Sequence, residues 1–366
     1  MTKWQKVKLG DVCECLGKGK HPASFSDIKG TYPFIVSGLS EKKCNEYDND
    51  DECFIIGDGG CANIHYVNGK YAASDHTYIF KSKDDRILTK YIYKYLSGNI
   101  RILEDGFKGA GIKNISKSYI MSILIPLPPK GEQERIAKEL DAVSDLLAKQ
   151  KQLLAEQDTL IKSVFYDMFG DPVTNDKGWK IEKFKNLGYL ARGKSKHRPR
   201  NDPKLLGGAY PLIQTGDIAQ ADLYIEKYKQ TYSDLGLAQS KMWNKGTLCI
   251  TIAANIAKTA ILKFDACFPD SVVGFISNSK SHIMFIQIWM SFLQKILEDN
   301  APQAAQKNIN LEILENLDVI VPPLPLQQKF ANIVEQIETQ KQTIKSAIAE
   351  TETLFNALMA KYFDEE

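Results

Sequence analysis

The chain has 366 residues, 43% hydrophobic and 25% charged, which is the composition of a globular protein large enough for two domains. No run of 18 apolar residues is present to span a membrane, and the first residues lack the apolar core of a secretory signal, so we expect a cytoplasmic protein. Seven cysteines at irregular spacing favour reduced thiols over a disulfide framework.

The net charge of +2 is unevenly distributed along the chain. Residues 1–130 carry 19 Lys and Arg against 15 Asp and Glu, and residues 172–322 carry 19 against 14. The two remaining segments, 131–171 and 323–366, are acidic. A basic excess confined to parts of the chain indicates a polyanionic partner, although a solvated basic surface would produce the same excess.

The second half of the chain repeats the first. In chain order, GKGKHP (17–22) matches GKSKHRP (193–199), YPFIVSG (32–38) matches YPLIQTG (210–216), and CFIIGDGGCANIHYV (53–67) aligns with TLCITIAANIAKTAI (247–261). The last pair reads as an apolar strand, a turn and a second strand, and the YP segments read as a strand ending in a tight turn rather than a binding element. Two domains of one architecture follow from this repeat.

A long helix is expected after each globular part. Apolar residues recur alternately at four and three positions, and the same seam returns 194 residues later. The seam comprises Leu140, Leu147, Leu154, Ile161, Val164, Val334, Ile337, Ile344, Ile348, Phe355 and Leu358. Each helix has roughly 38 residues and is about 57 Å long. One narrow apolar stripe on such a helix requires a partner, and the other copy is the obvious one.

The domain boundaries follow from these patterns, because Pro128-Pro129 and Pro322-Pro323 cannot lie inside a helix and Gly170 with Pro172 ends the first one. We expect a first globular domain at 1–130, a helix at 131–169, a linker at 170–178, a second globular domain at 179–324 and a helix at 325–363.

The helices can pair in either direction. Antiparallel pairing places Lys341 opposite Gln157, whereas parallel pairing places it opposite Leu147. A buried ammonium group is less costly beside an amide that accepts a hydrogen bond than beside an aliphatic side chain, which favours the antiparallel arrangement. The expected fold is therefore α+β, with two similar domains and an antiparallel coiled coil in a pseudo-twofold arrangement.

Basic segments at matched positions are the first candidate DNA contacts. Nine residues of the second half contain six basic side chains and no acid, and the first half has a sparser counterpart. The residues are Arg192, Lys194, Lys196, His197, Arg198 and Arg200, with Lys18, Lys20 and His21 in the first half. Alternating basic residues flanked by Gly and Pro suit a loop that follows a phosphate backbone. A solvated charged surface is the alternative interpretation.

The loop before each helix is the second candidate. GFKGAGIKNI (106–115) and NAPQAAQKNI (300–309) mix small residues with amides and lysines, which allows close approach to phosphates or base edges. The candidates are Lys108, Lys113, Asn114, Gln303, Gln306, Lys307 and Asn308. A flexible connector with an Asn cap explains the same composition equally well.

Signatures of catalysis and metal binding are missing from the sequence. It contains no P-loop and no G-x-G-x-x-G, and Gly57-Asp58-Gly59-Gly60 is more typical of a tight turn than of a phosphate loop. The cysteine spacing is not that of a zinc module, so buried thiols are the better interpretation. We therefore expect no catalytic residue, metal site or cofactor in this chain.

The arrangement resembles the specificity subunit of type I restriction-modification systems. The resemblance covers the whole chain and is carried by Trp4 with Leu9-Gly10-Asp11, the two KNI segments, IPLPP (125–129) with EQERIA (132–137), and VPPLPLQQKFA (321–331). It implies that each globular domain recognises one half of a bipartite, gapped DNA target. It also implies that the helices act as a spacer and dock two modification subunits. Restriction subunits would join them, and the partners, not this chain, would bind S-adenosylmethionine, ATP and magnesium.

Two other classes of protein remain as alternatives. An autonomous methyltransferase or nuclease would need a cofactor loop or a metal-binding carboxylate set, and neither is found. A coiled-coil interaction scaffold without DNA reading would explain the helices but not two domains with matched basic segments.

Overall fold

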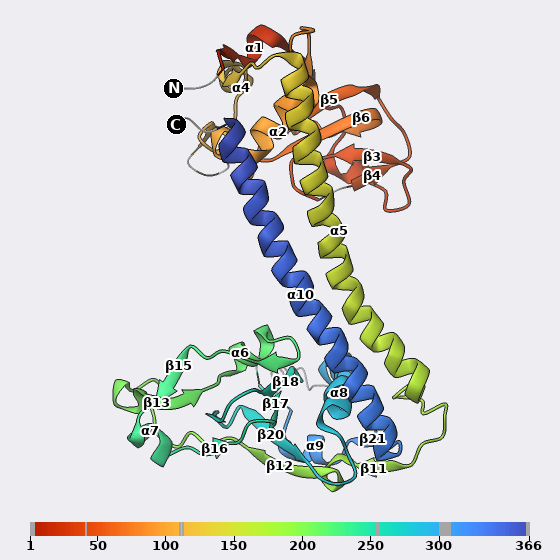
Figure 1. Ribbon diagram of the computed structural model, residues 1–366, viewed down its shortest axis with the longest axis vertical. Helices are drawn as coiled ribbons and strands as arrows, with labels where there is room; N and C mark the ends of the chain where they lie inside the picture. The colour runs from red at the N-terminus through yellow and green to blue at the C-terminus, as the bar shows by residue number, and fades with distance from the viewer. Residues whose placement is uncertain are drawn as a thin grey trace. The chain divides into compact units, whose positions relative to one another are not determined.

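The structure, a computed structural model, describes residues 4–40, 42–109, 111, 113–253, 257–299 and 309–363, with the backbone alone described at 293–299. The chain forms two compact units, residues 1–152 with 345–366, and residues 153–344. Each unit contains sheets, short helices and part of both long helices, which confirms the α+β fold class (Figure 1).

The first unit is built on a six-stranded sheet with the strand order β2-β7-β5-β6-β3-β4. Its elements are β1 (Lys6–Lys8), α1 (Leu9–Val12), β2 (Cys13–Lys18), a 3₁₀ turn (Ala23–Phe25), β3 (Tyr32–Ile35), β4 (Lys42–Cys44), β5 (Asn49–Gly57), β6 (Ile64–Ala73), β7 (Thr77–Ser82), α2 (Thr89–Gly98), α3 (Arg101–Glu104), β8 (Phe107–Lys108), β9 (Asn114–Ile115), α4 (Lys117–Ser122), β10 (Leu124–Pro126) and the start of α5 (Lys130–Phe169). All neighbours in the sheet are antiparallel except β3 and β6, where Phe34 lies opposite Ala72.

The core of this unit lies between β5 and α2. The second half of β5 is buried at every residue, as expected of a central strand covered on both faces. Phe54 of β5 stacks on Phe80 of β7 at a centroid distance of 5.3 Å, and Tyr91 of α2 packs in the same buried cluster. The same cluster includes Ile136 at the start of α5 and Phe363 at the end of α10, so the long helices complete this core.

The second unit contains two sheets, with strand orders β12-β20-β17-β18-β14 and β15-β13-β19-β16. Its elements are β11 (Ile181–Lys183), a 3₁₀ turn (Phe184–Asn186), β12 (Gly188–Arg192), a 3₁₀ turn (Pro203–Leu205), β13 (Leu206–Leu212), α6 (Thr215–Gln220), β14 (Tyr224–Ile225), β15 (Gln230–Tyr232), α7 (Asp234–Ala238), β16 (Met242–Trp243), β17 (Leu248–Thr251), β18 (Thr259–Leu262), β19 (Ala266–Cys267), β20 (Val272–Ser277), α8 (Ile283–Asp299), α9 (Leu311–Glu315), β21 (Asp318–Ile320) and α10 (Leu324–Phe363).

The two units share a topology, as the repeat predicts. The order β2-β7-β5-β6 returns as β12-β20-β17-β18, and the parallel pair of β3 with β6 returns as β13 with β19. In both units a short strand near the start pairs with the strand that precedes the long helix, β1 with β10 and β11 with β21. One difference lies after the YP strands, because β13 is followed by the helix α6 rather than by a simple turn.

The long helices α5 and α10 each span 40 residues. Gly170 follows α5 with a φ of +76°, a left-handed conformation in which its N–H bonds the carbonyl of Tyr166 at 2.9 Å. The eleven predicted seam residues are all buried or half-buried. The fully buried ones are Leu140, Ile161, Val334 and Ile337.

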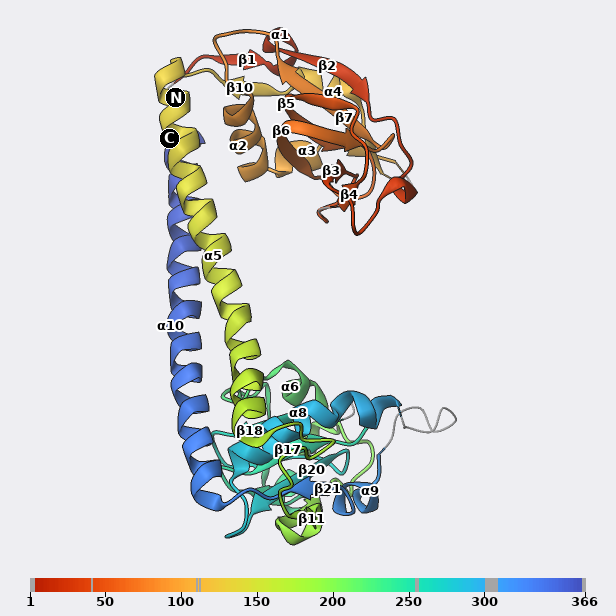
Figure 2. The same cartoon turned by 90° about the vertical axis from the view of Figure 1, so that its right-hand side faces the viewer.

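The helices pair in the antiparallel sense inside each unit, as predicted. In the first unit the start of α5 packs against the end of α10, where Leu140 shares a cluster with Met359 and Tyr362. In the second unit the end of α5 packs against the start of α10, where Ile161 shares a cluster with Val334 and Ile337 (Figures 1 and 2).

The buried Lys341 differs from the prediction in its partners. Its ammonium group donates to Asp158 Oδ1 at 2.8 Å and to Glu338 Oε1 at 2.9 Å, and not to the amide of Gln157. Desolvation acts to lower the pKa of Lys341, but these two carboxylates outweigh it and raise the pKa above its ordinary value. The antiparallel pairing therefore neutralises this charge with acids instead of with an amide.

Candidate nucleic-acid interface

The basic segment of the second unit continues from β12 in an extended form. Side chains alternate along it, so that Gly193 and Ser195 are buried while Lys194 and Lys196 are exposed. Gly193 is required because a Cβ there would lie 2.2 Å from the carbonyl oxygen of Phe268. The segment presents its two ammonium groups on one outward face.

A hydrogen-bonded support behind the segment holds this face in place. The Gln239 side-chain oxygen accepts from the backbone N–H groups of Lys196 and His197 at 2.6 and 3.1 Å. The hydroxyl of Ser240 donates to the carbonyl of Lys194 at 2.9 Å. Within the described ranges, no carboxylate lies within ion-pair distance of the Lys194 or Lys196 ammonium group, so both are available to phosphates.

Asp270 lies beside the arginines of the same segment, although no acid occurs in the segment itself. Its carboxylate bonds Arg200 at 2.5 Å and lies 3.7 Å from Arg198, and its backbone carbonyl accepts from Arg192 Nε at 2.7 Å. His197 pairs with Asp202 at 3.0 Å. The arginines are thus partly neutralised by a residue 70 positions beyond Arg200.

The basic residues of the first unit are likewise held by aspartates. Lys18 Nζ lies 2.5 Å from Asp58, and this hydrogen bond raises the pKa of Lys18 above its usual value. His21 bonds Asp48 at 2.8 Å, and Lys20 lies 3.8 Å from the same carboxylate. Both lysines nevertheless remain exposed, Lys18 at the end of β2 and Lys20 in the loop that follows. The two units thus present lysines at matched positions.

The loop before α5 comes close to Lys18 in the fold. β8 and β9 pair so that Lys108 lies opposite Asn114, and Asn114 forms a bridge with Gly59, the neighbour of Asp58. The N–H of Ile115 donates to the carbonyl of Asp58 at 3.0 Å. Lys108, Lys113 and Asn114 are all exposed. The basic segment at Lys18 and the loop before α5 were selected separately in the sequence, and both lie beside the turn at Asp58 and Gly59.

The corresponding loop of the second unit is only partly described. Gln303, Gln306, Lys307 and Asn308 lie outside the described residues. The next residue, Ile309, donates its N–H to the carbonyl of Ile252 at 3.0 Å. Ile309 and Ile252 each lie 194 positions after Ile115 and Asp58, so the attachment of this loop repeats as well.

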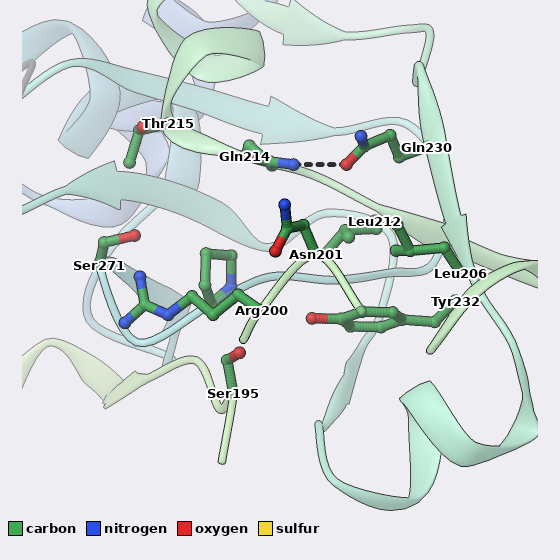
Figure 3. A pocket seen from close by; sticks show the side chains of 11 residues that line it. Ser195, Arg200, Asn201, Leu206, Leu212, Gln214, Thr215, Gln230, Tyr232 and Ser271 are labelled. Carbon is green, nitrogen blue, oxygen red and sulfur yellow. Dashed lines mark hydrogen bonds between the residues drawn. The ribbon is translucent and has the colours of Figure 1, made fainter. Parts of the chain in front are cut away.

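Sequence reasoning missed a hollow that adjoins the basic segment of the second unit. Figure 3 shows Asn201, Gln214 and Gln230 around it, together with the ring of Tyr232 and the side chain of Arg200. Gln214 belongs to the YPLIQTG segment, which reads as a purely structural strand end. The signal for it was an amide in a position where the first half has Val36.

No other chemical centre emerges from the described part of the chain. Groups of three His, Cys, Asp or Glu residues that could hold a metal ion are not found there. The seven cysteines are unpaired, and burial raises the pKa of Cys13 and of Cys53 to about 12. Cys61 is exposed, contrary to the expectation of buried thiols. Among the described helices, none has the length and apolar character needed to cross a bilayer.

Known proteins resemble this chain over nearly its whole length. The type I restriction enzyme EcoDI specificity subunit of Escherichia coli is 25% identical over 98% of this chain and 88% of its own length. The type I restriction enzyme MjaVIII specificity subunit of Methanocaldococcus jannaschii is 24% identical over 94% of this chain and 90% of its own length.

Solved structures share the fold. The S subunit of a type I restriction-modification system from M. genitalium superposes with a TM-score of 0.69 at 14% identity, covering 100% of this chain and 97% of that one. A chain from a study of complex assembly and conformational transition of the type I R-M system gives 0.58 at 17% identity, covering 99% and 98%. The profile of the type I restriction modification DNA specificity domain matches residues 1–157 and again 176–352. The chain therefore belongs to the type I restriction-modification specificity family and carries two copies of its DNA specificity domain.

Proposed function

We propose that this chain selects the DNA target of a type I restriction-modification complex, with each unit reading one half of a bipartite, gapped sequence. The observation that carries the proposal is the duplication of the specificity domain together with exposed lysines at matched positions, Lys18 with Lys20 and Lys194 with Lys196. Lysines on an extended segment neutralise phosphates without reading bases, so they fix the position of each unit on the duplex.

The partners and cofactors belong to the same proposal. The paired helices α5 and α10 dock two modification subunits, and restriction subunits join that assembly. S-adenosylmethionine, ATP and magnesium are bound by those partners, while this chain performs no catalysis. Support comes from the relatives, which are named as specificity subunits of restriction enzymes. A coiled-coil scaffold that does not read DNA is not favoured by two matches to a DNA specificity domain.

Domain exchange tests the proposal. Residues 1–130 are replaced by the corresponding domain of a relative, and the chimera is expressed with its modification subunits. Methylated sites are then mapped genome-wide. We expect one half of the target to change and the other to remain, because each unit has its own core and its own basic segment. A chimera that changed both halves together, or neither half, would overturn the assignment of one half-site to each unit.

A further inference from the structure

The hollow beside the basic segment of the second unit has about 220 Å³ of free volume. Four stretches of chain line it: the basic segment with Asn201, β13 through the start of α6, β15, and the loop before β20. Figure 3 shows Asn201 pointing toward the pair formed by Gln214 and Gln230, while the Arg200 side chain lies on the side of Ser271.

Two hydroxyl groups of buried residues lie at this hollow without partners. Tyr232 is 2% exposed and Ser195 is 6% exposed, yet both line the hollow, and Figure 3 shows the Tyr232 hydroxyl directed into it. Among the residues that the structure describes, neither hydroxyl has a hydrogen-bond partner. Both hydroxyls therefore face the hollow with hydrogen-bonding capacity that a ligand can use.

The exposed amides at the rim offer both a donor and an acceptor. Gln214 Nε2 donates to Gln230 Oε1 at 2.5 Å. This bond orients the two side chains and leaves the amide hydrogens of Gln230 free. The carbonyl oxygen of Gln214 accepts from the backbone N–H of Asp217 in the capping box of α6 and keeps its second lone pair for a ligand. A glutamine or asparagine that presents both groups matches N6 and N7 of adenine in the major groove.

Part of the lining is apolar. Leu206, Leu212 and Pro269 contribute aliphatic surface to the hollow. In the major groove of an A·T pair, the thymine presents its C5-methyl group and the O4 acceptor beside the adenine edge. The aliphatic surface suits the methyl group, and a hydroxyl such as that of Tyr232 suits O4.

We propose that this hollow reads an A·T base pair of the half-site recognised by the second unit, with Gln214 and Gln230 on adenine N6 and N7 and the aliphatic lining on the thymine methyl. The inference rests on the proposed function and adds the residues and the base pair. Lys194 and Lys196 hold the adjoining phosphates, so binding strength and base choice are assigned to different side chains.

Base analogues test the assignment directly. The target is first read from the methylome, and the complex with its modification subunits is then titrated with duplexes in which one position of the second half-site is altered. Replacing adenine with 7-deazaadenine removes the N7 acceptor, and replacing thymine with deoxyuridine removes the methyl group. At one A·T pair we expect the first change to weaken binding by about 5- to 150-fold, and the second by about fourfold.

Substitutions connect that base pair to the glutamines. In Gln230→Ala, which removes the donor to N7, the penalty for 7-deazaadenine should disappear while the deoxyuridine penalty remains. Gln214→Ala, which removes the bond that orients Gln230, should reduce the 7-deazaadenine penalty. Gln220→Ala is the matched control, because Gln220 lies on α6 but does not line the hollow, and it should keep both penalties. All three glutamines are exposed, and unchanged thermal unfolding of each variant establishes that the fold is retained.

The outcomes separate this inference from the proposed function. Glutamine variants that retain the full 7-deazaadenine penalty, or a second half-site composed of G·C pairs alone, would overturn the inference while leaving a two-domain reader intact. A complex that binds all sequences equally would overturn the proposed function itself.

Discussion

Gln133 and Gln327, 194 residues apart, make the same set of hydrogen bonds at the start of α5 and of α10. Each donates its amide to the carbonyl of the proline five residues earlier, Pro128 or Pro322, at 2.8 Å. Each also accepts from a backbone N–H just before the domain's own helix, at Leu88 or His282, at 2.8 Å. The same side-chain nitrogen also donates to a second carbonyl, that of Arg86 at 2.7 Å for Gln133 and that of Lys280 at 3.2 Å for Gln327. Both glutamines are fully buried.

These glutamines are expected to anchor each globular domain to its helix. Gln133→Leu or Gln327→Leu leaves buried backbone groups without partners, and we predict a loss of roughly 3 kcal/mol from the affected unit. Hydrogen exchange in urea would locate the loss. Gln150→Leu is the matched control, since Gln150 Oε1 is buried without a partner among the described residues, so removing it should be neutral or stabilising. Equal effects of all three substitutions would contradict this role.

We expect Lys341 to stabilise the fold mainly by neutralising the buried carboxylate of Glu338. Lys341→Met leaves the Glu338 carboxylate, whose side chain is 10% exposed, without its counter-charge, and we predict a loss of roughly 3 kcal/mol. Lys341→Met/Glu338→Leu should recover most of it, because both charges are then gone. Urea unfolding curves measure both changes, and a double variant no more stable than Lys341→Met would exclude the explanation.

The pH dependence of this pair follows from the raised pKa of Lys341. The stability from a group with a raised pKa is complete below the unfolded value, about 10.4, and is lost as the pH rises through the folded value. The difference between the wild type and Lys341→Met should therefore be complete at pH 7 and shrink only in strongly alkaline solution. A difference that fades between pH 5 and pH 8 would point to another group.

Lys194 and Lys196 are expected to supply phosphate contacts to the second unit. Lys194→Ala/Lys196→Ala should reduce the slope of log affinity against log salt by about two units, at every DNA sequence alike. Lys183→Ala/Lys185→Ala removes the same charge from the segment near β11 and should leave the slope unchanged. An unaltered slope in the first variant would remove the segment from the interface.

Asp270→Asn should act in the opposite direction. Freeing Arg198 and Arg200 from the carboxylate makes binding to unrelated DNA tighter and its salt slope steeper by about one unit. Asp318→Asn removes the same charge beside Lys183 and serves as the control. Filter binding at several salt concentrations measures both variants. Weaker binding by Asp270→Asn would mean that the carboxylate supports the loop structurally instead of restraining its charge.

The isolated chain is expected to transfer no methyl group and cut no DNA, with or without S-adenosylmethionine, ATP or a divalent metal. The reason is that no cofactor loop or carboxylate set of the required spacing occurs in the sequence. Radiolabelled methyl incorporation by protein purified free of partners is the measurement, and turnover there would overturn the assignment of chemistry to the partners.

Much of the fold could be predicted because its signals are periodic. The seam from Leu140 to Leu358 follows from heptad spacing, and β5 with β6 follows from an apolar run on each side of a turn. The counter-charges could not be predicted, since Asp58 and Asp270 approach Lys18 and Arg200 only through sheet pairing of distant strands. Gln214 was missed for a related reason, because a motif that ends a strand gives no indication of what its last side chain faces.

The aspartates beside the basic residues have a consequence for how the protein searches a genome. A reader with every cation free would remain for long periods on unrelated DNA, because phosphates are the same everywhere. Asp270 and Asp58 pair with part of that charge inside the protein, so we expect each encounter with unrelated DNA to be shorter. Long residence is then reserved for sites where base contacts add to the remaining phosphate contacts. We therefore expect the residence time on DNA to depend on acids that the basic segments themselves do not contain.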